Sequence, residues 1–222
     1  FTTKEGFEIA EQFFPKDLVK TFRVALSDLL NREKSIVSAQ RFQKSLSELL
    51  ASRDIVLDQT KIGLELFYLK SRPFQLAWIL YLISLILWAA PRKNKQVALT
   101  AFLFFISAFL IHAFGFILRI LIAGRPPVTN MYESIIWVSW AVCLFALILW
   151  FFYRSSLLPM IAACVAALSL LIGESFPALL DPSISPLVPV LRSNYWLTVH
   201  VLTITLGYGA FALNWGIAHA LL

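Results

Sequence analysis

Five long runs of apolar residues constrain the fold of this chain more than any other feature. They cover residues 74–90, 97–122, 134–153, 156–172 and 195–222. A helix rises 1.5 Å per residue, so about 17–25 apolar residues are needed to cross roughly 30 Å of hydrocarbon. All five runs approach or exceed that length, and 74–90 and 156–172 are close to the minimum. We therefore predict an all-α, polytopic transmembrane bundle of five spans.

The charged residues concentrate before the first apolar run. Residues 1–73 carry 12 Lys/Arg and 10 Asp/Glu, whereas residues 74–222 carry 7 and 3. Apolar residues recur with helical spacing over 16–30 and 36–50, and a third helix is expected to begin near residue 58 and to break at Pro73. The sequence thus predicts a short helical arm, 1–73, in front of a membrane region, 74–222.

The composition excludes some classes of protein. The chain is 59% hydrophobic and 14% charged, against roughly 45–50% apolar and 25% charged residues in soluble domains. Its net charge of +6 does not indicate nucleic-acid binding, because the arm is nearly neutral and the other cations flank the apolar runs. We predict a protein of the lipid bilayer with no nucleic-acid partner.

The distribution of cations also predicts an orientation. The loop 91–96 holds three cations and the turn after the third run holds Arg154, so the positive-inside rule places both in the cytoplasm. The arm and the loops 124–133 and 173–194 would then lie together outside. Arg119, Arg125 and Arg192 lie on that outer side and weaken the asymmetry.

The two cysteines and the two ends of the chain carry separate expectations. Cys143 and Cys164 lie inside apolar runs with no CxxC, CxxCH or His/Cys cluster, so we expect buried packing residues rather than a metal site. The chain starts at Phe1 and stops within an apolar run. We expect it to be a piece of a longer polypeptide.

The three histidines lie at different depths. His200 comes early in the fifth run, near the predicted outer surface, whereas His219 is about 28 Å further along the helix. His112 is in line with Gly115 and Arg119, a polar stripe in an apolar helix. For His112 we favour a hydrogen bond within the bundle over a binding role. For His200 a wetted interfacial histidine and a metal ligand both stay open.

The loop before the third run could bind an anion or cap a helix. It reads GRPPVTNMYES over 124–134 and delivers several polar side chains to one helix start. Arg125 could pair with a carboxylate or a propionate. In the alternative, Thr129 or Asn130 is the N-cap, and Glu133 is favoured by the helix dipole.

Two segments are distinctive, HAFGFILRILIAGRPPVTNMYESIIWVSW (112–140) and NYWLTVHVLTITLGYGAFAL (194–213). Together they resemble the CcsA/ResC family of System II cytochrome c biogenesis. In addition, DQTKIGLELFYLKSRPF (58–74) looks like the junction of fused CcsBA proteins, where a CcsB-like region leads into the CcsA part. The resemblance covers about 58–222 and is strongest from 97 onward.

The resemblance implies a holocytochrome c synthase, or haem lyase, that moves haem b outward and attaches its vinyl groups to the CxxCH thiols of apocytochrome c. A histidine in the YWLTVHV-like segment is an external axial haem ligand in that family, and this role falls on His200. Trp196 is then expected to pack on the porphyrin and Arg125 to meet a propionate, with His112 as a further haem-binding candidate; no catalytic residue is assigned.

The resemblance also implies partners and a compartment. The partners are apocytochrome c, the remainder of CcsBA or a separate CcsB subunit, and a thioredoxin-like thiol reductant. The compartment is the bacterial inner membrane, with the arm and the haem site on the extracytoplasmic side. The family's tryptophan-rich segment is expected beyond Leu222, so this chain alone is expected to be inactive. A haem or amphiphile transporter without bond-making chemistry and a structural membrane subunit are the alternatives.

Overall fold

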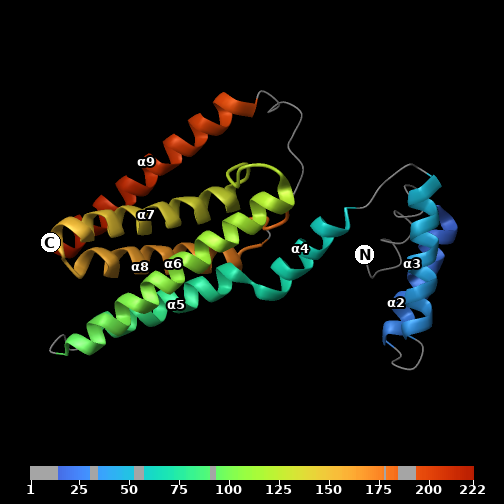
Figure 1. The fold of residues 1–222 in the computed structure, drawn as a ribbon, viewed down its shortest axis with the longest axis horizontal. Helices are drawn as coiled ribbons and strands as arrows, with labels where there is room; N and C mark the ends of the chain where they lie inside the picture. The colour runs from blue at the N-terminus through green and yellow to red at the C-terminus, as the bar shows by residue number, and fades with distance from the viewer. Residues whose placement is uncertain (1–14, 31–34, 53–57, 91–93, 178, 185–193) are drawn as a thin grey trace. The chain divides into compact units, whose positions relative to one another are not determined.

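The computed structural model describes residues 15–30, 35–52, 58–90, 94–177, 179–184 and 194–222 (Figure 1). Every regular element in these residues is an α-helix. Contacts between Cα atoms divide the chain into two units, 1–58 and 59–222, which are described separately. The predicted all-α class is confirmed.

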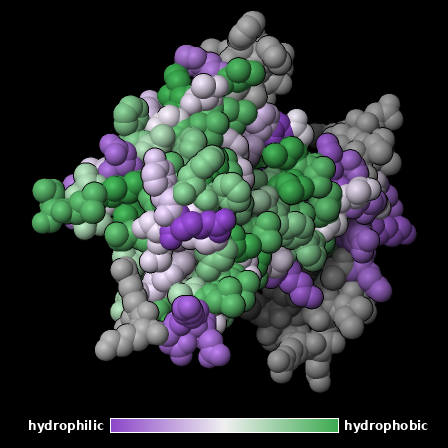
Figure 2. Space-filling view, turned by 60° about the vertical axis from the view of Figure 1, so that its left-hand side comes forward, coloured by the Kyte–Doolittle hydropathy of each residue, from purple (hydrophilic) through white to green (hydrophobic). Residues whose placement is uncertain are grey.

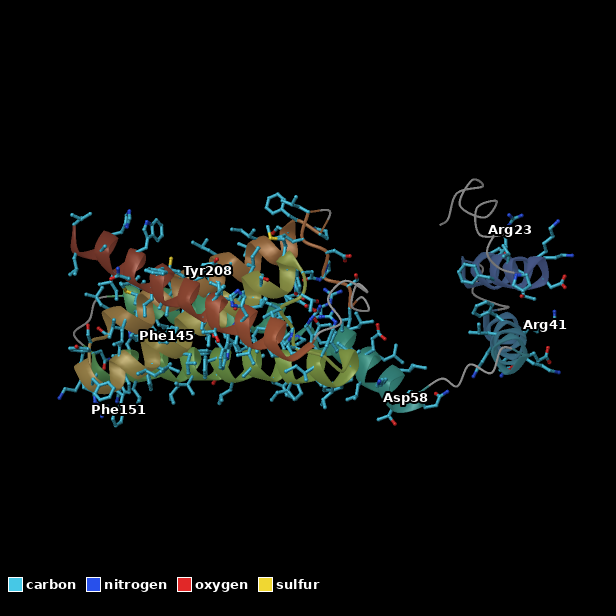
Figure 3. The ribbon with its side chains drawn as sticks, turned by 90° about the horizontal axis from the view of Figure 1, so that it is seen from above. Arg23, Arg41, Asp58, Phe145, Phe151 and Tyr208 are labelled. Atoms are coloured by element: carbon cyan, nitrogen blue, oxygen red, sulfur yellow. The ribbon has the colours of Figure 1, made fainter. Side chains whose placement is uncertain are left out.

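In the described residues of the first unit, two helices pack against each other, α2 (Lys16–Leu30) and α3 (Ser35–Ser52). The ring centroids of Phe22 and Phe42 are 5.3 Å apart across this contact. Arg23 and Arg41 are labelled on these two helices in Figure 3. Two amphipathic helices were predicted in this part of the chain, and the structure contains both.

The second unit contains the membrane helices. They are α4 (Gln59–Ser71), α5 (Pro73–Ala89), α6 (Lys95–Ala123), α7 (Met131–Tyr153), α8 (Leu157–Ser175) and α9 (Asn194–Leu221). Among the described residues, five helical stretches are long and apolar enough to cross a membrane, with α4 and α5 counted as one stretch. Hydrophobic side chains predominate on the face shown in Figure 2, and the hydrophilic ones form small separate groups. The protein is a multi-pass membrane protein.

Several helix ends differ from the ends of the apolar runs because caps and backbone conformation set them. Asn130 caps α7, so the third span begins at Met131 rather than at Ser134. The fourth span continues to Ser175, beyond the predicted end at Ile172. Arg72 has φ 42° and interrupts the helix between α4 and α5, where Pro73 takes the first position of α5. The predicted break at Pro73 is therefore present, and α4 belongs to the second unit by its contacts with α6.

The bundle core combines small residues with aromatic rings. Helix α5 packs on α6 and α8, and α7 packs on α8 and α9. Ala101 and Ala108 of α6 are fully buried. The ring pair Phe109–Trp140 joins α6 to α7, with stacked centroids 5.2 Å apart. Small residues bring the helices close together, and the rings fill the wider gaps between them.

Helix α9 packs on its neighbours through one face. Thr205, Gly209 and Leu213 are buried, and a Cβ added at Gly209 would lie 2.7 Å from the Cβ of Ala141 in α7. Another face of α9 is exposed at Thr203, Ala210 and Asn214, and nothing lies within 4 Å of a Cβ added at Gly207. Tyr208, labelled in Figure 3, is also exposed.

Candidate functional site

A buried ion network connects the end of α6 to the start of α7. Nη2 of Arg119 lies 2.9 Å from Oε1 of Glu133, and both side chains are 1% exposed. Nη1 of Arg125 lies 2.9 Å from Oε2 of the same carboxylate. One carboxylate is thus shared by two guanidinium groups, and the site carries a net positive charge.

The loop between α6 and α7 supplies further hydrogen bonds to the Glu133 carboxylate. The backbone N–H of Thr129 donates to Oε2 at 2.9 Å, and its hydroxyl does so at 2.8 Å. Arg125 also donates to the Thr129 hydroxyl. The Asn130 side chain accepts from the backbone N–H of Glu133 at 2.7 Å. The loop therefore caps α7 through Asn130 and also binds an anionic group, the carboxylate of Glu133.

The same network fixes the segment that follows α8. Nη1 of Arg119 donates to the carbonyl of Pro182 at 2.9 Å and to the hydroxyl of Tyr68 at 3.1 Å. Nδ2 of Asn130 donates to the carbonyl of Asp181 at 3.3 Å. Hydrogen bonds from the backbone and hydroxyl of Ser183 hold the pKa of Asp181 below its ordinary value. Residues from α4, α6, α7 and the segment after α8 therefore meet at one end of the bundle.

The geometry explains how charges are tolerated at this depth. Burying a charge costs several kcal/mol, and close pairing with additional hydrogen bonds offsets that cost. Both oxygens of Glu133 are bonded, and both arginines use more than one acceptor. The network is therefore a rigid cross-link rather than an open anion site.

His112 lies inside this bundle end, in an aromatic cage. It is 0% exposed, and its ring stacks on Phe116 with centroids 5.2 Å apart. The rings of Phe74 and Tyr81 contact it edge-on. Neither ring nitrogen has a hydrogen bond of acceptable geometry, although the backbone of Ile136 interacts with the ring. His112 is thus held by ring packing together with a polar contact to the backbone of Ile136 in α7.

The other two histidines are exposed. His200 lies in the early turns of α9. Nδ1 of His219 lies 2.9 Å from the carbonyl oxygen of Trp215, near the opposite end of the same helix. Trp196 belongs to α9, but its side chain lies outside the described part of the chain. The described residues form no group of three or more His, Cys, Asp or Glu side chains suited to a metal ion.

Sequence reasoning identified Arg119, Arg125 and Glu133 separately but not their pairing. An arginine within an apolar span requires a partner, and residues 74–222 contain only three acidic residues, Glu133, Glu174 and Asp181. That short set could have pointed to Glu133. The roles of Tyr68 and of the carbonyl of Pro182 had no sequence signal, because they depend on how the chain returns to this end of the bundle.

Comparison with known proteins identifies relatives along nearly the whole chain. Protein NrfI of Wolinella succinogenes is 29% identical over 222 residues, 95% of this chain and 24% of that protein. The cytochrome c biogenesis protein CcsA of Microcystis aeruginosa is 38% identical over 41% of this chain and 28% of its own length. CcsA of Synechococcus sp. (strain CC9311) is 33% identical over 62% of this chain and 44% of its own length. These similarities support the resemblance of the chain to CcsA cytochrome c biogenesis proteins.

The similarity comes with a difference in length. No protein-family model matches the chain, and the chain spans less than half of each of these three relatives. The matched region is therefore only part of each relative.

Proposed function

We propose that this chain is part of a membrane machine that exports haem and presents it for thioether attachment to the CxxCH motif of apocytochrome c. In this proposal the imidazole of His200 is an axial ligand of the haem iron. Neutral imidazole is a common iron ligand in proteins. The supporting observation is that His200 has an exposed side chain in the early turns of a membrane helix.

The surroundings of the three histidines favour His200 as the iron ligand. His112 is enclosed by aromatic rings and is 0% exposed, so an iron atom could reach it only if the core rearranged. His219 is exposed, but one of its ring nitrogens lies 2.9 Å from the carbonyl of Trp215. His200 has neither restriction among the described residues.

Trp196 and Arg125 are the other proposed haem contacts. Trp196 lies four residues before His200 in α9 and therefore on the same face of the helix. That register suits ring packing beside an iron-bound imidazole. Arg125 is 6% exposed and is bonded to Glu133 and Thr129. A propionate at Arg125 would have to share it with these partners.

The chemistry needs little from the protein besides position. A cysteine S–H adds across a haem vinyl group, the sulfur bonding to one carbon and the hydrogen ending on the other, so no atom leaves. Holding thiol and vinyl group together accounts for much of the rate. We propose the remainder of a CcsBA-type protein or a separate CcsB subunit as partner, with a thioredoxin-like protein that keeps the cysteines reduced.

The test is a haem spectrum of the purified protein with and without the histidine. His200→Ala is expected to weaken the Soret band, and added imidazole is expected to restore it, because imidazole can occupy the vacated coordination position. His219→Ala is the matched control, since it removes an exposed histidine from the same helix. A Soret band unchanged by His200→Ala would exclude the assignment.

A second measurement distinguishes covalent attachment of haem to the cytochrome from haem transport without attachment. A cytochrome with one CxxCH motif is produced together with the protein, and its covalently bound haem is measured after denaturation. The proposed function requires covalent haem that falls with His200→Ala. Haem bound to the protein with no covalent product in the cytochrome would instead indicate transport without bond-making.

A further inference from the structure

A pocket opens beside the ion network at the same bundle end and shares Tyr68 and Pro182 with it. Its volume is ≈ 370 Å³, and its walls come from the α4–α5 junction, the start of α7, the end of α8 and the segment after it. That volume falls within the roughly 300–1,000 Å³ of small-molecule sites. His200, Arg125 and Glu133 do not line it, so it is distinct from the haem ligand proposed above.

The backbone break between α4 and α5 builds one side of this pocket. Arg72, with φ 42° and ψ 58°, separates the two helices and lies at the pocket wall next to Phe74. On the opposite side, a Cβ added at Gly173 would lie 3.3 Å from the ring of Tyr132. The absence of a side chain at Gly173 therefore allows the Tyr132 ring to lie against α8.

Two opposite charges line this pocket without neutralising each other. Nη1 of Arg72 donates to Oε1 of Gln75 at 3.3 Å, and Oε2 of Glu174 accepts from the indole N–H of Trp78 at 2.6 Å. Both charged side chains are exposed. In the described part of the chain the ion pairs do not join Arg72 to Glu174. The pocket thus offers one cation and one anion, each with unused hydrogen-bonding capacity.

The remaining lining is apolar, and the pocket lies at the ends of membrane helices. Phe74 and Leu170 contribute apolar surface. Tyr132 is in the first turn of α7, Glu174 in the last turn of α8, and Trp78 in the second turn of α5. Tyrosine and tryptophan gather at the level of the lipid headgroups. A ligand at this depth can have a polar head in the pocket and an apolar tail along the helices.

We propose that this pocket binds the headgroup of an aminophospholipid, with the phosphate at Arg72 and the ammonium at Glu174. A guanidinium forms strong charge-assisted hydrogen bonds with phosphate, and a carboxylate does so with ammonium. An anionic lipid without an ammonium group, such as phosphatidylglycerol, matches only the arginine. A choline lipid has the correct charges, but its ammonium has no N–H to donate to Glu174.

The test measures lipid binding to the purified, delipidated protein by native mass spectrometry. Phosphatidylethanolamine is expected to bind more tightly than phosphatidylglycerol or phosphatidylcholine with the same acyl chains. Arg72→Gln is expected to weaken both phosphatidylethanolamine and phosphatidylglycerol binding about threefold to tenfold, because each lipid loses a charge-assisted bond. Glu174→Gln is expected to weaken phosphatidylethanolamine alone by a similar factor.

Matched controls are available within the chain. Arg154 also has positive φ and ends a helix, but it lies at the opposite end of α7, and Glu65 is an exposed carboxylate outside the pocket. Arg154→Gln and Glu65→Gln are expected to leave lipid binding unchanged, and thermal unfolding checks that all variants are folded. Equal losses in the controls, or loss of phosphatidylglycerol binding in Glu174→Gln, would overturn the proposal. Displacement of the lipid by soluble phosphoethanolamine at an equal concentration would also overturn it.

Discussion

At the residue scale, Glu133 is the centre of the bundle end described above. It accepts from two guanidinium groups, a backbone amide and a hydroxyl, while its own backbone N–H is held by the helix cap. Removing one member of a buried ion pair leaves its partner uncompensated, which costs more than the pair contributes when intact. The arginines at this site therefore depend on a single carboxylate.

Glu133→Gln is expected to destabilise the protein by about 3–5 kcal/mol, since Arg119 and Arg125 would stay buried without a counter-charge. For a chain of this size that corresponds to a fall in melting temperature on the order of 10 °C. Thermal unfolding in detergent measures it.

The exposed carboxylate of Glu65 is the control for this substitution. Glu65→Gln is expected to leave the melting temperature nearly unchanged. Combining Arg119→Gln with Glu133→Gln is expected to recover part of the loss, because one buried cation disappears together with its partner. A Glu133→Gln protein as stable as Glu65→Gln would show that the network contributes nothing to folding.

At the element scale, α9 is held by a narrow face. Gly209 lets it approach α7, and Gly216 lets it approach Ile161 of α8. Because glycine has no side chain, the backbone of α9 comes close to α7 and α8, and dispersion contacts stabilise this packing in lipid. The opposite face of α9 carries the exposed side chains, including Tyr208 (Figure 3).

Two glycines of α9, two residues apart, give opposite expectations for the same substitution. Gly209→Ala would place a Cβ 2.7 Å from the Cβ of Ala141, a short side chain that cannot move aside, so α9 must shift and the melting temperature is expected to fall. Gly207→Ala meets nothing within 4 Å and is expected to hold or raise the melting temperature, since alanine is the better helix former. Equal effects of the two substitutions would contradict the packing of α9.

At the scale of the whole molecule, the helices bring chain segments far apart in sequence to one bundle end. Tyr68 of α4, Arg119 of α6, Glu133 of α7 and the carbonyl of Pro182 all contribute. The charge distribution predicts that this end faces away from the cytoplasm, and we propose the bacterial inner membrane as the location. The chain beyond α8 would then carry His200 on the same side.

The orientation can be tested with single cysteines and a membrane-impermeant maleimide in intact cells. Leu179→Cys replaces an 80% exposed residue at the predicted outer end, and Gln96→Cys replaces an exposed residue at the predicted cytoplasmic end. Leu179→Cys is expected to react before cell lysis and Gln96→Cys only after it. The unsubstituted protein controls for Cys143 and Cys164, and the reverse pattern would invert the proposed topology.

The all-α transmembrane class could be predicted from the sequence, because hydrocarbon thickness requires long apolar helices. The resemblance to CcsA proteins could also be found there, because the motifs at the helix ends are contiguous in the sequence. The sequence also placed His112, Gly115 and Arg119 on one helix face, which the structure buries. The packed face of α9 is visible only in the folded chain, since Gly207 and Gly209 are the same residue type and differ only in their neighbours. The tertiary structure also decided that Arg119 and Arg125 share Glu133, because an ion pair depends on distance between helices.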